Sequence, residues 1–199
     1  MVDVLTTIIP YTMMPNSRLR SLSKLVVWQG KSGAMVQCGV WNGGSAALMA
    51  YMLPASDVWL FDSFEGLPPP GPKDGPKAHR KFAAAPPGWC QGEQDKVREV
   101  FGKIGWPMTH LHIVPGWFAD TLETVDIGPL TLLHIDADFY DSTLLPLQRF
   151  YPLLQPGGLL IVDDYGHWPG AKAACDEYLQ GALGNELQPG DPTRWWMVK

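Results

Sequence analysis

Two pairs of aspartates carry the strongest chemical signal in this sequence, because each pair directly follows a short apolar run. Asp136 and Asp138 follow one run, and Asp163 and Asp164 follow the next. Carboxylates that meet at one place repel each other and are costly to desolvate unless a cation lies between them. Ligation by oxygen alone, without cysteine or histidine, favours a hard ion such as Mg²⁺, Mn²⁺ or Ca²⁺. We therefore predict a divalent-cation site held by Asp136, Asp163 and Asp164.

A glycine-rich stretch follows the apolar run Ala34–Cys38. Gly39, Gly43 and Gly44 allow a tight turn, and the helix-like stretch from Ser45 presents unpaired N–H groups to an anionic ligand. The spacing is G-x-x-x-G-G, which differs from the dinucleotide pattern G-x-G-x-x-G. Taken alone, this stretch fits a ligand-binding turn and a turn without a ligand about equally well.

Three further aspartates have both functional and structural interpretations. Asp62 ends the run Val58–Phe61, one strand after the glycine turn, and is well placed to accept hydrogen bonds from two ribose hydroxyls. A capping or turn aspartate is the alternative. Asp141 directly precedes the helical run 142–154 and is expected to cap it. Asp138 is expected to lie behind the metal ligands.

The five histidines divide by their surroundings. His110, His112 and His134 lie in or beside apolar runs, where a packed or sheet-edge histidine is expected. His167 follows the second aspartate pair and is a candidate for substrate contact. His79 lies in a segment rich in proline and glycine, from which an imidazole can reach a substrate hydroxyl as a general base.

The alternation of short apolar runs with helix-like stretches predicts the elements that position these residues. Strands buried on both faces, each followed by a helix, are typical of a parallel α/β sheet with helices on both faces, which binds ligands at the carboxyl ends of its strands where the strand order reverses. Strands are expected at 34–38, 58–61, 111–114, 130–135 and 159–162, with an antiparallel edge strand at 194–198. Helices are expected at 17–29, 45–53, 93–104, 120–123, 142–154 and 171–183.

Residues 63–91 do not fit this alternation. The segment contains seven prolines and four glycines, so we expect no regular element there. Loops of this length in a compact domain are often lids or binding loops, and the aromatic residues in this one favour an ordered lid. We expect residues 1–199 to form a single domain, with 1–33 as an amino-terminal segment and entry helix.

Composition excludes several classes of protein. The chain has 199 residues, 46% hydrophobic and 18% charged, enough to bury one core. A net charge of -5 without a basic cluster argues against nucleic acid as a partner. No apolar run reaches the roughly 18 residues that cross a bilayer, and no secretion signal is present, so we expect a cytoplasmic protein without a membrane partner. The three cysteines are expected to be reduced thiols.

With these residues in view, the chain resembles the macrocin O-methyltransferase family, metal-dependent enzymes that use S-adenosylmethionine to methylate sugar hydroxyls of natural products. The matching strings run in family order along nearly the whole chain. They are YTM (11–13), GVWNGG (39–44), DSFEGLP (62–68), PGWFADTL (115–122), DADFYDST (136–143) and VDDYG (162–166).

The resemblance implies a class I, Rossmann-like methyltransferase fold, with S-adenosylmethionine and a divalent ion such as Mg²⁺ as cofactors. It implies Asp136, Asp163 and Asp164 as metal ligands, with Asp136 and a base at His79 as catalytic residues. The acceptor would be a hydroxyl of a small glycosylated or polyol natural product, and the number of subunits stays open, a homo-oligomer included. Implied cofactor contacts are Tyr11, Thr12, Met13, Gln37, Gly39, Ser45, Asp62, Ser63, Gly116, Trp117, Phe118 and Asp136.

Two positions depart from the family pattern. Gln37 stands where the family has an acid, so it keeps a carbonyl but lacks the negative charge that favours the cationic end of the cofactor, and Asn42 stands where arginine is usual. The reaction expected from the resemblance is in-line methyl transfer from sulfur to a metal-bound hydroxyl. Two alternatives remain open: a metal-dependent hydrolase, which leaves the glycine turn and Asp62 without a role, and a non-catalytic ligand-binding relative.

Overall fold

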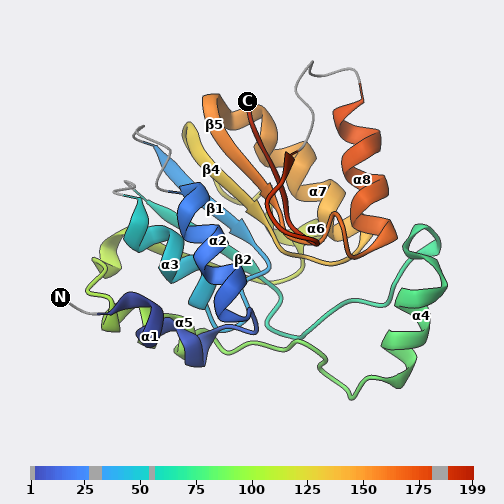
Figure 1. Cartoon of the computed structure of the whole chain (residues 1–199), viewed down its shortest axis with the longest axis horizontal. Helices are drawn as coiled ribbons and strands as arrows, with labels where there is room; N and C mark the ends of the chain where they lie inside the picture. Colours follow the sequence, from blue (N-terminus) through green and yellow to red (C-terminus); the bar gives the residue numbers. More distant parts are fainter. Residues whose placement is uncertain (1–2, 27–32, 54–56, 181–187) are drawn as a thin grey trace.

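The computed structural model describes residues 3–26, 33–53, 57–180 and 188–199, and the strands in these ranges form one sheet (Figure 1). Its order is β3-β2-β1-β4-β5-β7-β6. The strands are β1 Ala34–Cys38, β2 Val58–Asp62, β3 Leu111–Pro115, β4 Leu130–Ile135, β5 Leu154–Val162, β6 Gln188–Pro189 and β7 Trp195–Val198.

The first five strands are parallel, and β7 adds to β5 in the antiparallel direction, as the sequence predicted. The strand order reverses between β1 and β4, whose last residues Cys38 and Ile135 lie opposite each other. Ile135 in turn pairs with Val162, and Cys38 with Phe61. The turns that follow β1, β2, β4 and β5 therefore meet at one edge of the sheet.

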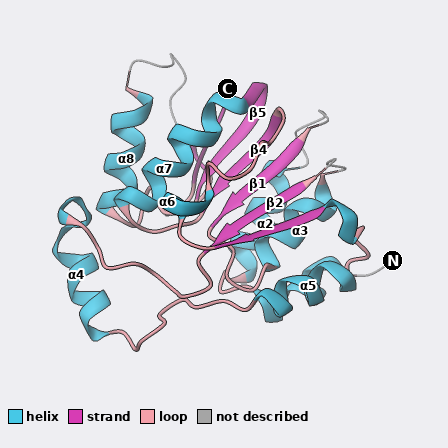
Figure 2. Cartoon of the chain, turned by 180° about the vertical axis from the view of Figure 1, so that it is seen from behind, coloured by secondary structure: helices cyan, strands magenta, loops and turns pink. Residues whose placement is uncertain are grey.

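Helices cover both faces of the sheet, as Figure 2 shows from behind. On one face, α1, α2, α3 and α5 pack over a core that includes Met35, Leu60 and Leu132. On the other, α6, α7 and α8 cover Val36 and Leu133. The helices are α1 Val4–Ile8, α2 Asn16–Val26, α3 Gly44–Met52, α4 Gly75–Ala84, α5 Gln94–Lys103, α6 Phe118–Thr121, α7 Tyr140–Phe150 and α8 Pro169–Leu179.

Helix α4 corrects the expectation that residues 63–91 hold no regular element. A 3-10 turn at Pro72–Asp74 leads directly into α4, with Pro76 in the first turn of the helix, where its missing N–H leaves no hydrogen bond unmade. The prolines therefore flank or begin the helix, while residues 77–84 are mostly helix-forming types. The sequence-based prediction was wrong because it considered the number of prolines and not their positions along the segment.

The segment around α4 is tied to the helices that follow β4 and β5. Buried Asp74 accepts the Tyr140 N–H at 2.7 Å, at the start of α7. Lys73 contacts Glu177 of α8 at 2.7 Å, and Lys77 donates to the carbonyl of His167 at 3.0 Å. Figure 1 shows α4 set off from the sheet, and these contacts join it to the carboxyl edge.

Several boundaries also differ from expectation. Helix α7 begins at Tyr140, so Asp141 lies in its first turn instead of capping it. β5 begins at Leu154, earlier than predicted, and neither α1 nor β6 was expected. The predicted helix positions 27–29 and 181–183 lie outside the described residues. No helix within the described ranges is long and apolar enough to cross a membrane.

Candidate active site

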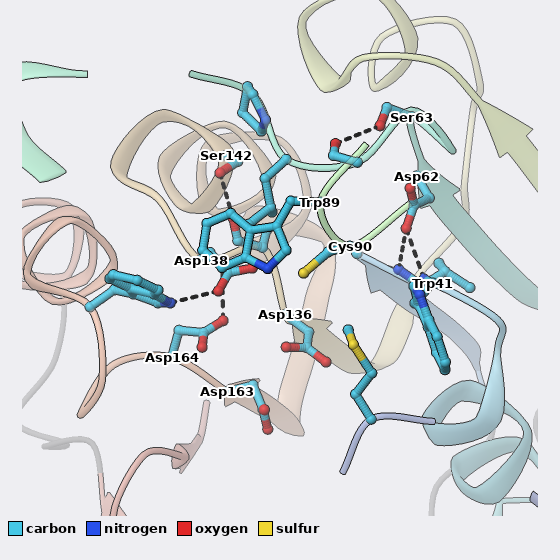
Figure 3. A pocket seen from close by; sticks show the side chains of 18 of the residues that line it. Trp41, Asp62, Ser63, Trp89, Cys90, Asp136, Asp138, Ser142, Asp163 and Asp164 are labelled. Carbon is cyan, nitrogen blue, oxygen red and sulfur yellow. Dashed lines mark hydrogen bonds between the residues drawn. The ribbon is translucent and has the colours of Figure 1, made fainter. Parts of the chain in front are cut away.

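A pocket of about 580 Å³ opens at the carboxyl edge of the sheet (Figure 3). Its walls come from the turns after the parallel strands, from the segment before α2 and from the segment between β2 and α5. Most residues expected from the sequence to be functional lie around it. These are Tyr11, Thr12, Met13, Gly39, Ser45, Asp62, Ser63, Trp117, Phe118, Asp136, Asp163 and Asp164.

Three expected site residues, His79, Gly116 and Gln37, do not line the pocket. His79 is exposed on α4, and its Nε2 lies 3.1 Å from the carbonyl oxygen of Gly71. Gly116 directly precedes the pocket residue Trp117, and its N–H donates to the Asp62 carbonyl at 2.9 Å. The structure therefore does not bring His79 to the other predicted site residues, whereas Gly116 joins the turn after β3 to the end of β2.

The carboxylates after β4 and β5 converge as predicted. Asp136, Asp163 and Asp164 each offer an oxygen, and these atoms lie within 4.8 Å of one another. Burial raises the pKa of Asp136 well above its usual value, and the negative charges of Asp163 and Asp138 raise it further. Burial also raises the pKa of Asp164 well above its usual value, with repulsion from the neighbouring aspartates acting in the same direction. Such groups resist ionisation until a positive charge arrives, so the donor set fits a hard divalent cation.

Asp138 lines the pocket beside these carboxylates. Its backbone adopts a positive φ of 64°, and its N–H donates to the Asp164 carboxylate at 3.1 Å. Trp168 Nε1 donates to Asp138 Oδ1 at 2.6 Å. Burial raises the pKa of Asp138 to about 6, although the Trp168 hydrogen bond opposes the rise. Figure 3 shows Asp138 beside Asp164 in the pocket.

Asp163 differs from its neighbours because two arginines already neutralise it. Arg194 Nε donates to Asp163 Oδ1 at 2.5 Å, and an Arg18 guanidinium nitrogen donates to Oδ2. Burial acts to raise the pKa of Asp163, but His134, Arg194 and Arg18 outweigh it and hold the pKa far below its usual range. Sequence reasoning missed both arginines, since neither lies near the aspartates along the chain.

The glycine turn and Asp62 form a second part of the pocket. Asp62 Oδ2 accepts the N–H groups of Val40 and Trp41 at 2.6 and 2.9 Å, and Oδ1 accepts that of Phe64 at 2.8 Å. Gly39 has a φ of 84°, and a Cβ there would lie 1.8 Å from the carbonyl oxygen of Asp136. The end of β1 therefore lies against the backbone that carries Asp136, and only glycine fits between them.

Gln37 lies fully buried beneath this turn and outside the pocket wall. Its Nε2 donates to the Gly39 carbonyl at 2.7 Å and to Ser45 Oγ at 2.9 Å. Its Oε1 is buried and has no hydrogen-bond partner. An acceptor left unpaired at this position is rare in a folded protein and suits a donor supplied by a ligand.

The opposite wall of the pocket is built from α4 and the turn after β5. It contains His167, Trp168 and Lys81, and Lys81 Nζ lies 5.5 Å from the centre of the Trp168 ring. Lys77 Nζ lies 3.4 Å from His167 Nε2. Burial lowers the pKa of His167, and the charges of Lys77 and Lys81 lower it further. The wall therefore combines an aromatic surface with an imidazole that is neutral near pH 7.

The remaining histidines have the structural positions expected for them. His134 is fully buried in β4, and burial lowers its pKa. His110 and His112 lie at the opposite end of the sheet from the pocket, 3.3 and 2.8 Å from the Asp57 carboxylate, and His112 stacks on Trp59.

Comparisons with known proteins show which family the chain is similar to. The family model of macrocin O-methyltransferase (TylF) matches residues 6–189. Demethyldecarbamoylnovobiocin O-methyltransferase of Streptomyces niveus is 37% identical over 177 residues, 84% of this chain and 67% of that protein. Mycinamicin III 3''-O-methyltransferase of Micromonospora griseorubida is 32% identical over 183 residues, 85% of this chain and 70% of that protein. The chain thus spans about two thirds of the length of these relatives.

Solved structures give the same result. The O-methyltransferase NovP superposes with a TM-score of 0.80 at 31% identity, covering 95% of this chain and 82% of that one. The calicheamicin methyltransferase CalS11, at 20% identity and a TM-score of 0.70, shares the fold and covers 98% of this chain and 89% of its own. The fold is that of the class I S-adenosylmethionine-dependent methyltransferases, which are enzymes. Within this class, the chain belongs to the macrocin O-methyltransferase (TylF) family, so the resemblance stated from the sequence is confirmed.

Proposed function

We propose that this protein transfers a methyl group from S-adenosylmethionine to a hydroxyl of a sugar or other small natural product, with the help of a divalent cation. The observation that carries the proposal is the meeting of three carboxylates within 4.8 Å in the pocket that also contains the glycine turn and Asp62. The named relatives, which are sugar and natural-product O-methyltransferases, support the acceptor class. They do not favour the hydrolase or the non-catalytic alternative.

The cofactor is proposed to bind over the turn after β1. Asp62 can accept hydrogen bonds from a ribose. Gln37 contributes from beneath the turn, where its Nε2 donates to the Gly39 carbonyl and to Ser45 Oγ and its Oε1 is unpaired. The segment Tyr11–Met13 lies against this turn, because the Tyr11 carbonyl oxygen would lie 2.6 Å from a Cβ at Gly44. We assign the remaining contacts to Ser45, Ser63 and Gly116–Phe118.

The metal is proposed to bind between Asp136, Asp163 and Asp164. When bound, it would supply Lewis-acid polarisation of the acceptor hydroxyl and hold it in place. Trp168 and Lys81 offer the acceptor an apolar face and a donor. We propose His167 as the proton acceptor, because it lines the pocket and its pKa is lowered, whereas the earlier candidate His79 lies outside the wall. General-base assistance contributes about 10²- to 10⁴-fold.

The test is calorimetric titration of the protein with S-adenosylhomocysteine, with and without Mg²⁺, followed by a methyl-transfer assay on a glycosylated acceptor. We expect nucleoside binding that persists in chelator and turnover that does not. Metal binding without nucleoside binding would favour the hydrolase, and nucleoside binding without turnover on any hydroxyl acceptor would favour the non-catalytic relative.

A further inference from the structure

Arg18 lies between two carboxylates, Asp163 and Asp191. One of its terminal nitrogens donates to Asp163, whereas its Nε lies 3.5 Å from Asp191 Oδ2 without a hydrogen bond. Both Arg18 Nε and Asp191 Oδ2 are buried and have no hydrogen-bond partner. Two buried polar atoms of opposite charge, close together and both unpaired, indicate a contact that is nearly formed.

Of the two arginines that contact Asp163, Arg18 is the more exposed. Arg194 has no exposed surface, and besides Asp163 its guanidinium donates to the Arg18 carbonyl at 2.9 Å and lies 3.2 Å from Met14 Sδ. The Arg18 side chain is 26% exposed and lines the pocket. Arg18 is therefore the arginine that can leave Asp163 with the smaller change to the packed interior.

The Asp191 carboxylate is held in a position where it can accept a hydrogen bond from Arg18. Oδ1 of Asp191 accepts the N–H of Thr193 at 3.0 Å, the Thr193 hydroxyl at 3.1 Å and the N–H of Arg194 at 2.9 Å, which fixes the carboxylate. Within the part of the chain that the structure describes, Oδ2 has no hydrogen-bond partner, and its ion pairs are with Arg194 Nη1 at 3.3 Å and Arg18 Nε at 3.5 Å. A short movement of Arg18 would satisfy both unpaired atoms.

A divalent cation and Arg18 would compete for the Asp163 carboxylate. Both oxygens of Asp163 already accept from a guanidinium, Oδ1 from Arg194 and Oδ2 from Arg18, so an ion between the three carboxylates would have to share Asp163 with an arginine. Two positive charges a few ångströms apart repel strongly even at an effective dielectric constant of about 20. We propose that Arg18 competes with the divalent cation for Asp163 and transfers to Asp191 when the ion binds. This inference rests on the proposed metal site, and it assigns Arg18 and Asp191 as positioning residues for that site.

The experiment is titration of the full chain with Mn²⁺, followed by calorimetry or by the electron paramagnetic resonance signal of free Mn²⁺. Arg18→Met and Arg18→Gln remove the competitor, so both should bind Mn²⁺ about tenfold or more tightly than the unmodified protein. Asp191→Asn keeps the Oδ1 contacts but removes the charge that receives Arg18, so it should bind Mn²⁺ several-fold more weakly. Arg20→Met, an exposed change of equal charge on the same helix, should leave the affinity unchanged.

The double variant Arg18→Met/Asp191→Asn separates the transfer from a general charge effect. If Asp191 acts through Arg18, the Asp191→Asn change should have little effect on Mn²⁺ affinity once Arg18 is replaced. An equal loss in both backgrounds, or weaker Mn²⁺ binding by both Arg18 variants, overturns the proposal while the metal site stands. If neither the unmodified protein nor Arg18→Met binds Mn²⁺, the metal site and the inference fall together, whereas binding by Arg18→Met alone supports the competition.

Discussion

The fully buried guanidinium of Arg194 donates its Nε–H to Asp163 Oδ1 at 2.5 Å, joining the residue before β7 to the end of β5. Since Asp163 is also bound by Arg18, its carboxylate balances two cations in addition to any ion in the pocket. Asp136 and Asp164 have no such ion pair among the described residues. The three predicted metal ligands are therefore unequal in their contribution to stability.

Asp163→Asn should lower the free energy of unfolding by about 3 to 5 kcal/mol, because it removes the nearer counter-charge of buried Arg194 and leaves the more distant Asp191 Oδ2, 3.3 Å from Nη1. In metal-free protein at pH 7.5, Asp136→Asn and Asp164→Asn should instead be neutral or stabilising, because each removes repulsion. All three should abolish Mn²⁺ binding while leaving S-adenosylhomocysteine binding largely intact. Denaturant unfolding and calorimetry measure these effects, and equal stability losses in the three variants would contradict the unequal roles.

Asp62→Ala should weaken S-adenosylhomocysteine binding by about 1 to 3 kcal/mol, the range for a lost hydrogen bond to a charged group. The variant also frees the N–H groups of Val40 and Trp41, which adds to the loss. Asp57→Ala, just before the opposite end of β2, is the matched control and should leave the affinity unchanged. Calorimetry decides, and unaltered affinity in Asp62→Ala would place the nucleoside elsewhere.

Gln37→Glu should favour S-adenosylmethionine over S-adenosylhomocysteine, because a negative charge attracts the sulfonium. It should also destabilise the cofactor-free protein by about 1 to 3 kcal/mol, since the Gln37 amide donates to the Gly39 carbonyl and a carboxylate cannot. The two dissociation constants and the unfolding free energy are the measurements, with Gln37→Met as the control for shape. Equal changes in both affinities would show that position 37 does not sense the sulfur charge.

The Asp138 carboxyl should make the metal-free protein lose stability as the pH rises from about 4 to 6. The pKa of Asp138 is raised from 3.8 to about 6 by burial, so the folded state binds more protons than the unfolded state in this window, and stability falls with pH. A rise of this size corresponds to about 3 kcal/mol. Asp136 and Asp164 shift in the same direction, so the loss should continue above pH 6.

Denaturant unfolding at pH 4.5 and 7.5 measures this loss, and saturating Mg²⁺ should remove most of it by compensating the carboxylates. Asp138→Asn, which can still accept from Trp168, should have the flatter profile. The low pKa of Asp163 has the opposite sign: its stabilisation disappears only in strong acid, below the unfolded value of 3.8. The lowered pKa values of His134 and His167 act in the opposite direction below pH 6.5, and the comparison with Asp138→Asn cancels their contribution. A variant profile as steep as that of the unmodified protein would refute the assignment to Asp138.

His167→Ala should reduce turnover by about 10²- to 10⁴-fold, as expected for loss of a general base, with cofactor affinity little changed. The lowered pKa of His167 places the acidic limb of the turnover profile below pH 6.5 in the unmodified enzyme, and the variant should lose that limb. His79→Ala, on the exposed face of α4, should affect turnover only slightly. A large loss of turnover in His79→Ala and a small one in His167→Ala would identify His79 as the general base, as predicted from the sequence.

The convergence of the aspartates was predictable because parallel strands align their ends: once 130–135 and 159–162 are neighbouring strands, Asp136 and Asp163 lie close together. No comparable rule reveals Arg194. It lies at the start of a short apolar run, and its partners Asp163 and Arg18 are 31 and 176 residues away along the chain. Buried ion pairs of this kind depend on how the finished elements pack, and local pattern carries no trace of them.

The contact between Gly39 and Asp136 implies that the cofactor turn and the metal ligand cannot be displaced independently. With 1.8 Å between a Cβ at Gly39 and the Asp136 carbonyl oxygen, main chain alone sets the spacing of the two sites. If binding of a ligand at one site shifts the contact between Gly39 and Asp136, the geometry of the other site changes as well. Thermodynamic linkage then requires each ligand to alter the affinity of the other by the same factor. The order in which cofactor and ion bind would then depend on kinetics. The factor by which each changes the affinity of the other would be transmitted through the close backbone contact that Gly39 permits.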